Sequence, residues 1–221
     1  MGEVAGDPGV FVRSMATRGA MGGLARGTLD AVDVLDAAGY EIVVIETVGV
    51  GQDEVEVARA AHTTVVVSAP GLGDDIQAIK SGILEIADIH VVGKSDRADA
   101  AKAVAELKNM LAMGFPHARH GEWEVPVLPT SAVMGEGIAA LREAIDSHHA
   151  ALRACGAMAS RHAAINERRL LIAGEEMLRN VFTRERERHI TPLLKELDER
   201  TLSPHAAAKR LFDAIRKGDD L

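Results

Sequence analysis

Residues 88–96 read DIHVVGKSD, a short β-branched run that ends directly in a lysine and an aspartate. The run is nearly continuous in isoleucine and valine, without alternation between apolar and polar residues. Such continuity is typical of a strand that is buried on both faces, as in a parallel sheet covered by helices. The stretch therefore predicts one buried strand that ends in Lys94, Ser95 and Asp96.

Three further runs have the same character. They are EIVVIET (41–47), TTVVVSA (63–69) and VPVLPTSA (125–132). Stretches of helical length lie between the runs, over residues 22–38, 73–87, 97–113 and 135–151. Strand and helix in repeated alternation predict an α/β domain with a doubly wound, mostly parallel sheet. We expect this domain to occupy residues 1–150.

The strand signals stop after residue 150. Residues 157–188 are rich in Ala, Glu, Arg and Leu, and a second helix is predicted over 191–200. A third helix has Ser203 as its N-cap and Pro204 at its first position, both of which are favoured at a helix start. We therefore expect a helical tail over 151–221, whose apolar stripe must be covered by the α/β domain or by a second copy.

Composition excludes several classes of partner. The 221 residues carry 25 Lys and Arg against 33 Asp and Glu, a net charge of −8. This acidic balance argues against a nucleic-acid surface and a basic membrane anchor. No apolar run approaches the roughly 18 residues of a membrane span. The single cysteine fits a reducing compartment, so we expect a cytoplasmic protein that binds neither nucleic acid nor membrane.

The run EIVVIET leads into VGVGQDE, so that a carboxylate at a strand end is followed closely by glycine. Nucleotide hydrolases place such a carboxylate near a metal ion and a terminal phosphate. Glu46 would face Mg²⁺ through its water shell, and the Gly49 backbone N–H would approach the γ-phosphate without an intervening side chain. The alternative is a strand followed by a flexible turn, and these residues alone leave both interpretations open.

The end of the 88–96 stretch resembles the Asn-Lys-x-Asp motif of guanine-nucleotide proteins. In that motif the aspartate accepts two hydrogen bonds from the guanine base, and the lysine stem packs over the base. Lys94 and Asp96 match these two roles, but Gly93 stands at the asparagine position. We expect this difference to loosen the pocket more than it removes base selectivity.

The stretch TSAVMGEGIAAL (130–141) strengthens the nucleotide interpretation. In many GTPases a strand ends in Ser-Ala, and the alanine backbone N–H binds the guanine O6. Ser131 and Ala132 match this pair, about 35 residues after the KSD stretch. The order and spacing are more specific than either motif alone.

Longer stretches resemble one family, the methylmalonyl-CoA mutase-associated GTPases of the MeaB/ArgK type. They are DPGVFVRSMATRGAMGGLA, IVVIETVGVGQDEVEVA, PGLGDDIQAIKSGILEIADIHVVGKSD and LSPHAAAKRLF. The resemblance extends from residue 7 to about residue 215. It implies a homodimeric P-loop GTPase that binds GTP, GDP and Mg²⁺. It also implies a chaperone of an adenosylcobalamin-dependent mutase, which gates cofactor delivery and protects the mutase from inactivation.

The resemblance also implies roles for individual residues. Asp7 and Glu46 would be carboxylates of the Mg²⁺ site, and Gly49 would contact the γ-phosphate. The guanine pocket would comprise Lys94, Asp96, Ser131 and Ala132. The segment 70–80 resembles the switch that couples the nucleotide to the mutase, with Asp74, Asp75, Gln77 and Lys80 in it. A competing assignment is an ATP-using relative, against which Asp96 argues.

The phosphate-loop motif G-x-x-x-x-G-K-[ST] does not occur in the 221 residues. Gly93, Lys94 and Ser95 end like that motif, but Asp88 stands at its first glycine and a buried strand lies between. Because the strand before the loop normally lies inside the sheet, its absence should leave neighbouring strand edges unpaired. We expect a copy truncated at its N-terminus. A second possibility is a non-catalytic remnant that dimerises and docks the mutase.

Nine histidines raise the question of a metal site, especially His117-x-x-His120 and the pair His148-His149. Two histidines at such spacing are unspecific for zinc. We expect these histidines to bind no metal, and Cys155 to be a structural residue.

Overall fold

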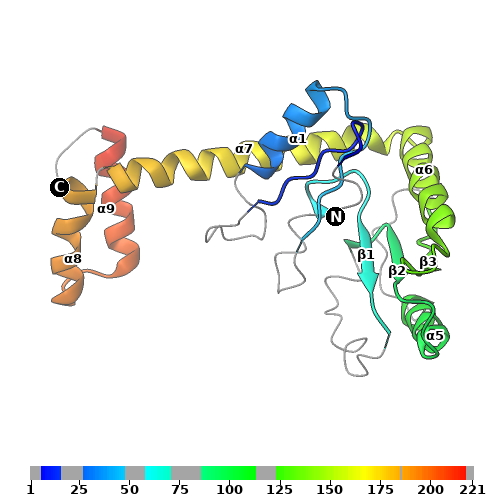
Figure 1. The fold of residues 1–221 in the computed structure, drawn as a ribbon. Helices are drawn as coiled ribbons and strands as arrows, with labels where there is room; N and C mark the ends of the chain where they lie inside the picture. The colour runs from blue at the N-terminus through cyan, green and yellow to red at the C-terminus, as the bar shows by residue number, and fades with distance from the viewer. Residues whose placement is uncertain are drawn as a thin grey trace. The chain divides into compact units, whose positions relative to one another are not determined.

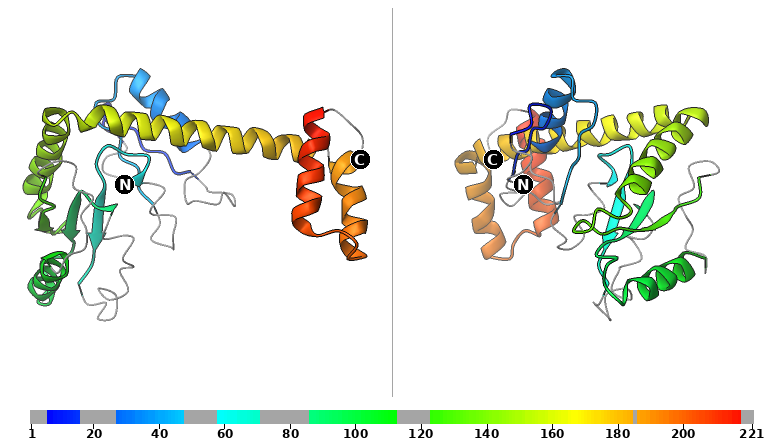
Figure 2. Two further views of the ribbon diagram at one scale, coloured as in Figure 1. Left: turned by 180° about the vertical axis from the view of Figure 1, so that it is seen from behind. Right: turned by 45° about the vertical axis from the view of Figure 1, so that its right-hand side comes forward.

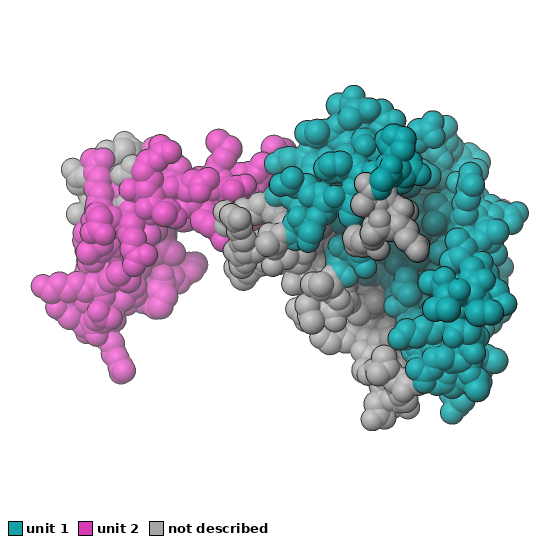
Figure 3. Space-filling view, viewed as in Figure 1, with its two compact units in different colours: residues 1–166 teal, residues 167–221 magenta. Residues whose placement is uncertain are grey.

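The computed structural model describes residues 6–15, 27–47, 58–70, 86–112, 123–184 and 186–217 (Figure 1). The chain forms two compact units, Met1–Asn166 and Glu167–Leu221, which Figure 3 shows in teal and magenta. The division falls within a long helix. The boundary between domain and tail that the sequence predicted, at residue 150, stays a prediction. The role of the tail in dimerisation stays a prediction.

The first unit contains a parallel three-stranded sheet. Its strands are β1 (Val65–Ser68), β2 (Ile89–Val92) and β3 (Val127–Pro129), in the order β1-β2-β3. Val65 pairs with Ile89, and His90 pairs with Val127. Three of the four predicted strands are therefore confirmed, and the α/β class with them.

Strand β2 lies at the centre of this sheet and is buried along its whole length. None of its four side chains is more than 2% exposed. Since successive side chains of a strand point to opposite faces, both faces of β2 are covered. Helices α5 (Ala100–Ala112) and α6 (Ile138–Ala154) both contact β2, and Figure 2 shows them beside the strands in green and lime.

Helix α5 supplies most of the apolar core beside the sheet. Its buried side chains recur at the spacing of one helical face and are Ala100, Ala103, Leu107 and Leu111. The last three pack with Val92 and Val127 in one cluster. The predicted helix over 97–113 is thus confirmed. Its apolar face packs on β2 and β3, which explains why apolar residues recur in these two strands.

Four more of the predicted helices form. They are α1 (Thr28–Ala37), α7 (Ala157–Arg184), α8 (Thr191–Asp198) and α9 (Pro204–Lys217). A short π-helix, η1 (Arg186–Ile190), contacts both α8 and α9. The Ser203 hydroxyl accepts a hydrogen bond from the Ala206 N–H at 3.3 Å, which confirms the predicted N-cap. The predicted helix over 73–87 lies almost wholly outside the described residues.

The predicted strand over residues 41–47 is wrong. This segment has no strand or helix assignment, and the side chains of Ile42 and Val44 are 73% and 83% exposed. A β-branched run forms a strand only when its backbone groups pair with a neighbour. In the described sheet β1 is an edge strand, and its Val67 is 67% exposed.

Two glycines between β3 and α6 give a test of this connection. Gly135 and Gly137 both have positive φ, at 71° and 74°. A Cβ at Gly137 would lie 2.2 Å from the Pro129 carbonyl oxygen, whereas a Cβ at Gly135 would meet nothing within 4 Å. We expect Gly135→Ala to lower the free energy of unfolding by roughly 1 to 2 kcal/mol, which is the cost of the left-handed conformation.

For Gly137→Ala we expect a loss of roughly 3 kcal/mol or more, because displacement of packed backbone adds to that conformational cost. Urea denaturation of both variants measures the difference. Equal losses in the two variants would show that the contact with Pro129 does not constrain the turn.

Candidate functional site

The candidate site lies where β2 and β3 end. Parallel strands bring their carboxyl ends to one edge of a sheet, which is where open α/β sheets bind ligands. The Ser95 N–H donates a hydrogen bond to the Thr130 carbonyl at 2.9 Å, and the Thr130 N–H donates to the Val92 carbonyl at 2.9 Å. These backbone bonds hold the two connecting segments together, so that the KSD and TSA stretches form one edge.

Ser131 joins the two stretches through its side chain. Its hydroxyl donates a hydrogen bond of 2.5 Å to Asp96 Oδ1 and accepts one from the Met134 N–H at 3.2 Å. Ser131 is fully buried, and its N–H donates to the Glu136 carbonyl at 2.9 Å. The serine therefore acts as a fixed support that orients the Asp96 carboxylate.

Asp96 is exposed and is held in its charged form. The hydrogen bond from Ser131 is the main reason that its pKa lies below the ordinary value, and a bond from the Asp96 backbone and the charges of Arg97 and Lys94 act in the same direction. A charged carboxylate only accepts hydrogen bonds. The site can thus receive a ligand edge that carries two N–H donors.

Lys94 occupies an unusual backbone conformation beside Asp96. Its φ is 53°, a left-handed value that is uncommon outside glycine. Its carbonyl accepts a hydrogen bond from the Arg97 N–H at 3.0 Å, which closes a tight turn. Non-glycine residues in such conformations cluster at ligand sites, and the exposed lysine is next to the carboxylate.

Gly93 connects this turn to the first strand. Its N–H donates a hydrogen bond of 2.8 Å to the Ser68 carbonyl. A Cβ built on Gly93 would lie 3.5 Å from that carbonyl oxygen and 3.6 Å from a Val67 methyl carbon, which are ordinary contact distances. The backbone therefore has room for a larger residue at this position.

Among the predicted phosphate and metal residues, the structure describes Asp7 and Glu46. Asp7 and Glu46 are both exposed, and Asp7 Oδ1 accepts a hydrogen bond from the Gly9 N–H at 2.8 Å within its own turn. The described residues contain no group of three His, Cys, Asp or Glu side chains that could hold a metal ion. The Mg²⁺ site at Asp7 and Glu46 stays a prediction.

Five further predicted residues lie outside the described residues. They are Gly49, Asp74, Asp75, Gln77 and Lys80. The backbone N–H groups of Ser95 and Met134 complete the hydrogen-bond network around Thr130 and Ser131. The sequence analysis did not predict these two donors. Their only sequence signal is adjacency to the two motifs, because backbone groups leave no trace in residue type.

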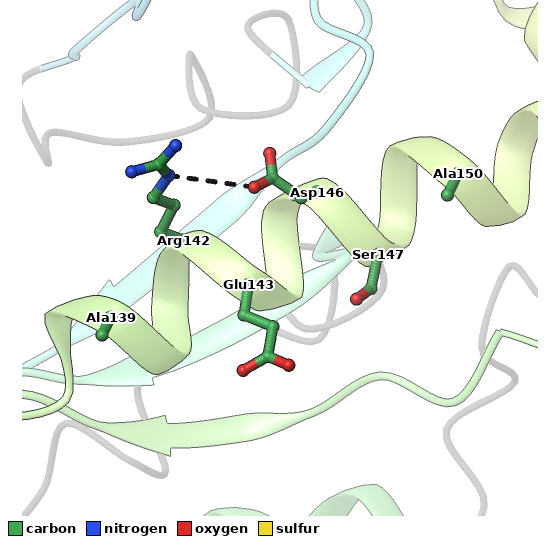
Figure 4. A pocket seen from close by; sticks show the side chains of 6 residues that line it. All are labelled: Ala139, Arg142, Glu143, Asp146, Ser147 and Ala150. Carbon is green, nitrogen blue, oxygen red and sulfur yellow. Dashed lines mark ion pairs between the residues drawn. The ribbon is translucent and has the colours of Figure 1, made fainter.

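A depression on the surface lies elsewhere, along α6. Its lining consists of Ala139, Arg142, Glu143, Asp146, Ser147 and Ala150. Figure 4 shows that all six side chains come from this one helix, with an ion pair of 3.8 Å between Arg142 and Asp146. None of them is a predicted site residue. The Ser131–Asp96 pair, not this open helix face, therefore remains the candidate site.

Comparisons with known proteins agree on one family. The family model described as methylmalonyl Co-A mutase-associated GTPase MeaB matches residues 1–187. A protein from Pyrococcus abyssi is 39% identical over 213 residues, which are 96% of this chain and 66% of that protein. GTPase ArgK from Escherichia coli strain K12 is 33% identical over 220 residues, which are 98% and 66% of the two chains.

The fold is also that of a solved structure. The crystal structure of a LAO/AO transport system kinase superposes with a TM-score of 0.64 at 30% identity, over 85% of this chain and 61% of that one. The chain thus spans 66% of the length of the two relatives and 61% of that of the solved structure, less than two thirds in each case. Its parallel sheet and covering helices are those of an α/β P-loop protein. The chain belongs to the MeaB family of methylmalonyl-CoA mutase-associated GTPases.

Proposed function

We propose that this chain provides the guanine-binding part of a GTPase and binds GTP and GDP at the ends of β2 and β3. The observation that carries the proposal is the 2.5 Å hydrogen bond from buried Ser131 to exposed Asp96. It fixes a charged carboxylate beside Lys94. The Ala132 N–H, which follows Ser131 in the turn, would bind the guanine O6.

Base chemistry explains why such a site favours guanine. Guanine presents an N1–H and an exocyclic amino group on one edge, and the two oxygens of a carboxylate can accept both. Adenine has an unprotonated ring nitrogen at the equivalent position, which repels a carboxylate. The alternative, an ATP-using relative, is therefore disfavoured by Asp96.

Hydrolysis requires more than this base pocket. Phosphoryl transfer depends on phosphate-loop N–H groups, a lysine at the β- and γ-phosphates and a bound Mg²⁺. The 221 residues contain no G-x-x-x-x-G-K-[ST] motif. We therefore propose turnover, with Asp7, Glu46 and Gly49 near the metal ion and γ-phosphate, only for a protein that also carries this loop. For the 221 residues alone we propose binding without turnover.

The proposed partner is an adenosylcobalamin-dependent mutase such as methylmalonyl-CoA mutase. Support comes from the description of the family model, which names association with that mutase. The GTPase would gate cofactor loading and protect the mutase, and residues of the segment 70–80 would couple the nucleotide state to it. A second candidate is a remnant that docks the mutase without turnover.

Homodimerisation through the helical tail is supported by an uncovered apolar stripe on α7. The helix has no buried residue in its 28 positions. Four large apolar side chains are 47% to 73% exposed, and they are Leu170, Leu171, Met177 and Leu178. Pairs of them are seven residues apart, so they share one side of the helix. A second copy of the same helix is a matching surface.

We propose a cytoplasmic location, which the single cysteine supports because it suits a reducing compartment. Among the helices that the structure describes, none combines the length and the apolar character that membrane crossing requires.

Asp96→Ala tests the proposed function. We expect the wild-type chain to bind GDP more tightly than ADP, and the variant to lose roughly tenfold to hundredfold in GDP affinity, because a charge-assisted hydrogen bond contributes about 1.5 to 3 kcal/mol. Ser131→Ala should show a smaller loss, since it frees the carboxylate without removing it. Calorimetric titration with each nucleotide measures the affinities.

Asp146→Ala is the matched control, because it removes an exposed carboxylate of α6 away from the site. Equal affinity for GDP and ADP, or an unchanged affinity in Asp96→Ala, would contradict the proposal. The same samples are assayed with GTP and Mg²⁺. Robust GTP hydrolysis would contradict binding without turnover, and mutase capture that ignores the nucleotide would favour the docking remnant.

Gly93→Asn tests the departure from the guanine motif. We expect the variant to fold with a free energy of unfolding about 0.4 to 1 kcal/mol above the wild type, because the Cβ fits and glycine loses more freedom on folding. Gly93→Ala is the control and should gain the same stability. If the position belongs to a guanine pocket, only the asparagine variant should bind GDP more tightly, and equal GDP affinity in both variants contradicts that role.

The double substitution Leu171→Glu with Leu178→Glu tests the tail. We expect the wild-type chain to be a dimer by light scattering after gel filtration, and the variant to be a monomer, because two charges would be buried without partners. Asn180→Glu adds a charge at another exposed position of α7 and should leave the dimer intact. A monomeric wild type at micromolar concentration, or a dimeric double variant, would exclude this stripe as the interface.

A further inference from the structure

A buried carboxylate lies at the start of β2, at the other end of this strand from the candidate site. Asp88 is 6% exposed. It accepts a hydrogen bond from the Thr64 N–H at 2.8 Å and two from the Arg161 guanidinium, at 2.9 Å and 2.5 Å. This two-pronged pair is the strong form of an arginine–carboxylate contact. Since Arg161 lies near the start of α7, the pair fastens that helix to the sheet.

His148 of α6 lies against the same carboxylate. Its ring is fully buried, with Nε2 at 3.3 Å from Asp88 Oδ1 and Nδ1 at 2.9 Å from the Thr63 hydroxyl. The Trp123 indole N–H donates a hydrogen bond of 2.9 Å to the Asp88 carbonyl, and the two ring centres of Trp123 and His148 are 4.9 Å apart. A single Oδ1 atom thus lies near both His148 and Arg161.

Two more imidazoles face each other beside this pair. The rings of His62 and His162 meet edge to face, with their centres 4.6 Å apart. Arg161 also donates a hydrogen bond to the His62 carbonyl. Burial lowers the pKa of His62 below its ordinary value, and the neighbouring His162, His149 and Arg161 lower it further.

These four histidines form what we name the histidine cluster: His62, His148, His149 and His162. Near neutral pH the positive charge of Arg161 is balanced by Asp88. Each imidazole that gains a proton adds a positive charge to this group. A proton on His62 would repel the guanidinium of Arg161, which donates to the His62 carbonyl and to Asp88. This repulsion weakens the contact between the start of α7 and residues 61–64.

We propose that the histidine cluster and the Asp88–Arg161 pair form an acid-sensitive latch, which holds the first turns of α7 against residues 61–64 near neutral pH and releases them in mild acid. The folded state favours neutral His62, so the contact is complete above the ordinary histidine value of about 6.5. It weakens as the pH falls below that value and through the lowered pKa of His62. The latch is distinct from the proposed nucleotide site, since Asp88 and Asp96 lie at opposite ends of β2.

Hydrogen exchange of the full chain tests the latch. The backbone amides of residues 161–166 are compared at pH 7.5 and pH 5.5, after correction for intrinsic exchange rates. We expect their protection to be lower at pH 5.5 than at pH 7.5, because the folded state disfavours the proton that His62 gains in acid. The double variant that combines His62→Gln with His162→Gln should retain its protection at pH 5.5.

His205→Gln is the matched control, because His205 is an exposed histidine of α9; it should behave as the wild type. His62→Gln alone is the milder variant if the double variant is unfolded at pH 7.5. Equal protection of the wild type at both pH values would overturn the latch, and so would an undiminished loss in the variants. Because no nucleotide is added, failure here would leave the proposed GTP binding unaffected.

Discussion

The pairing of β2 on both edges and its burial on both faces constrain the first unit more than any other feature. A strand of this kind cannot slip by one residue, because the shift would exchange the side chains on its two faces. Its position therefore fixes what lies at its ends. Asp88 is held at the start, where it meets α6 and α7, and Lys94 and Asp96 are held at the end, where they meet the segment after β3.

Three strands could be predicted from the sequence because burial on both faces leaves a composition signal. The 41–47 segment carries the same signal and yet is not a strand. An apolar composition indicates that both faces of a strand can be buried. Formation of the strand also requires a neighbour that hydrogen-bonds along its edge. That neighbour can be far away in the sequence, so a β-branched run predicts the capacity to form a strand and not its partner.

The site could be predicted as far as side chains form a motif. The contact between Asp96 and Ser131 joins residues 35 apart, and the spacing of two short motifs indicated it. The contact between Asp88 and Arg161 joins residues 73 apart and was missed. No motif links these residues, and the His148-His149 pair was considered only as a metal ligand. Burial turned His148 into part of a polar network, which residue type alone does not reveal.

Asp88 and Asp96, which flank β2, show how the environment of a carboxylate decides its role. Asp88 is buried and engaged by Thr64 and Arg161, so its charge is already compensated within the protein and opening it to a ligand would leave a guanidinium unpaired. Asp96 is exposed and has one side-chain donor, Ser131, so its charge is oriented but not neutralised. Only a carboxylate of the second kind can give its acceptor capacity to a base. One strand thus has a buried ion pair at its start and a ligand-binding carboxylate at its end. Because the strand is fixed in register, both groups are held in place.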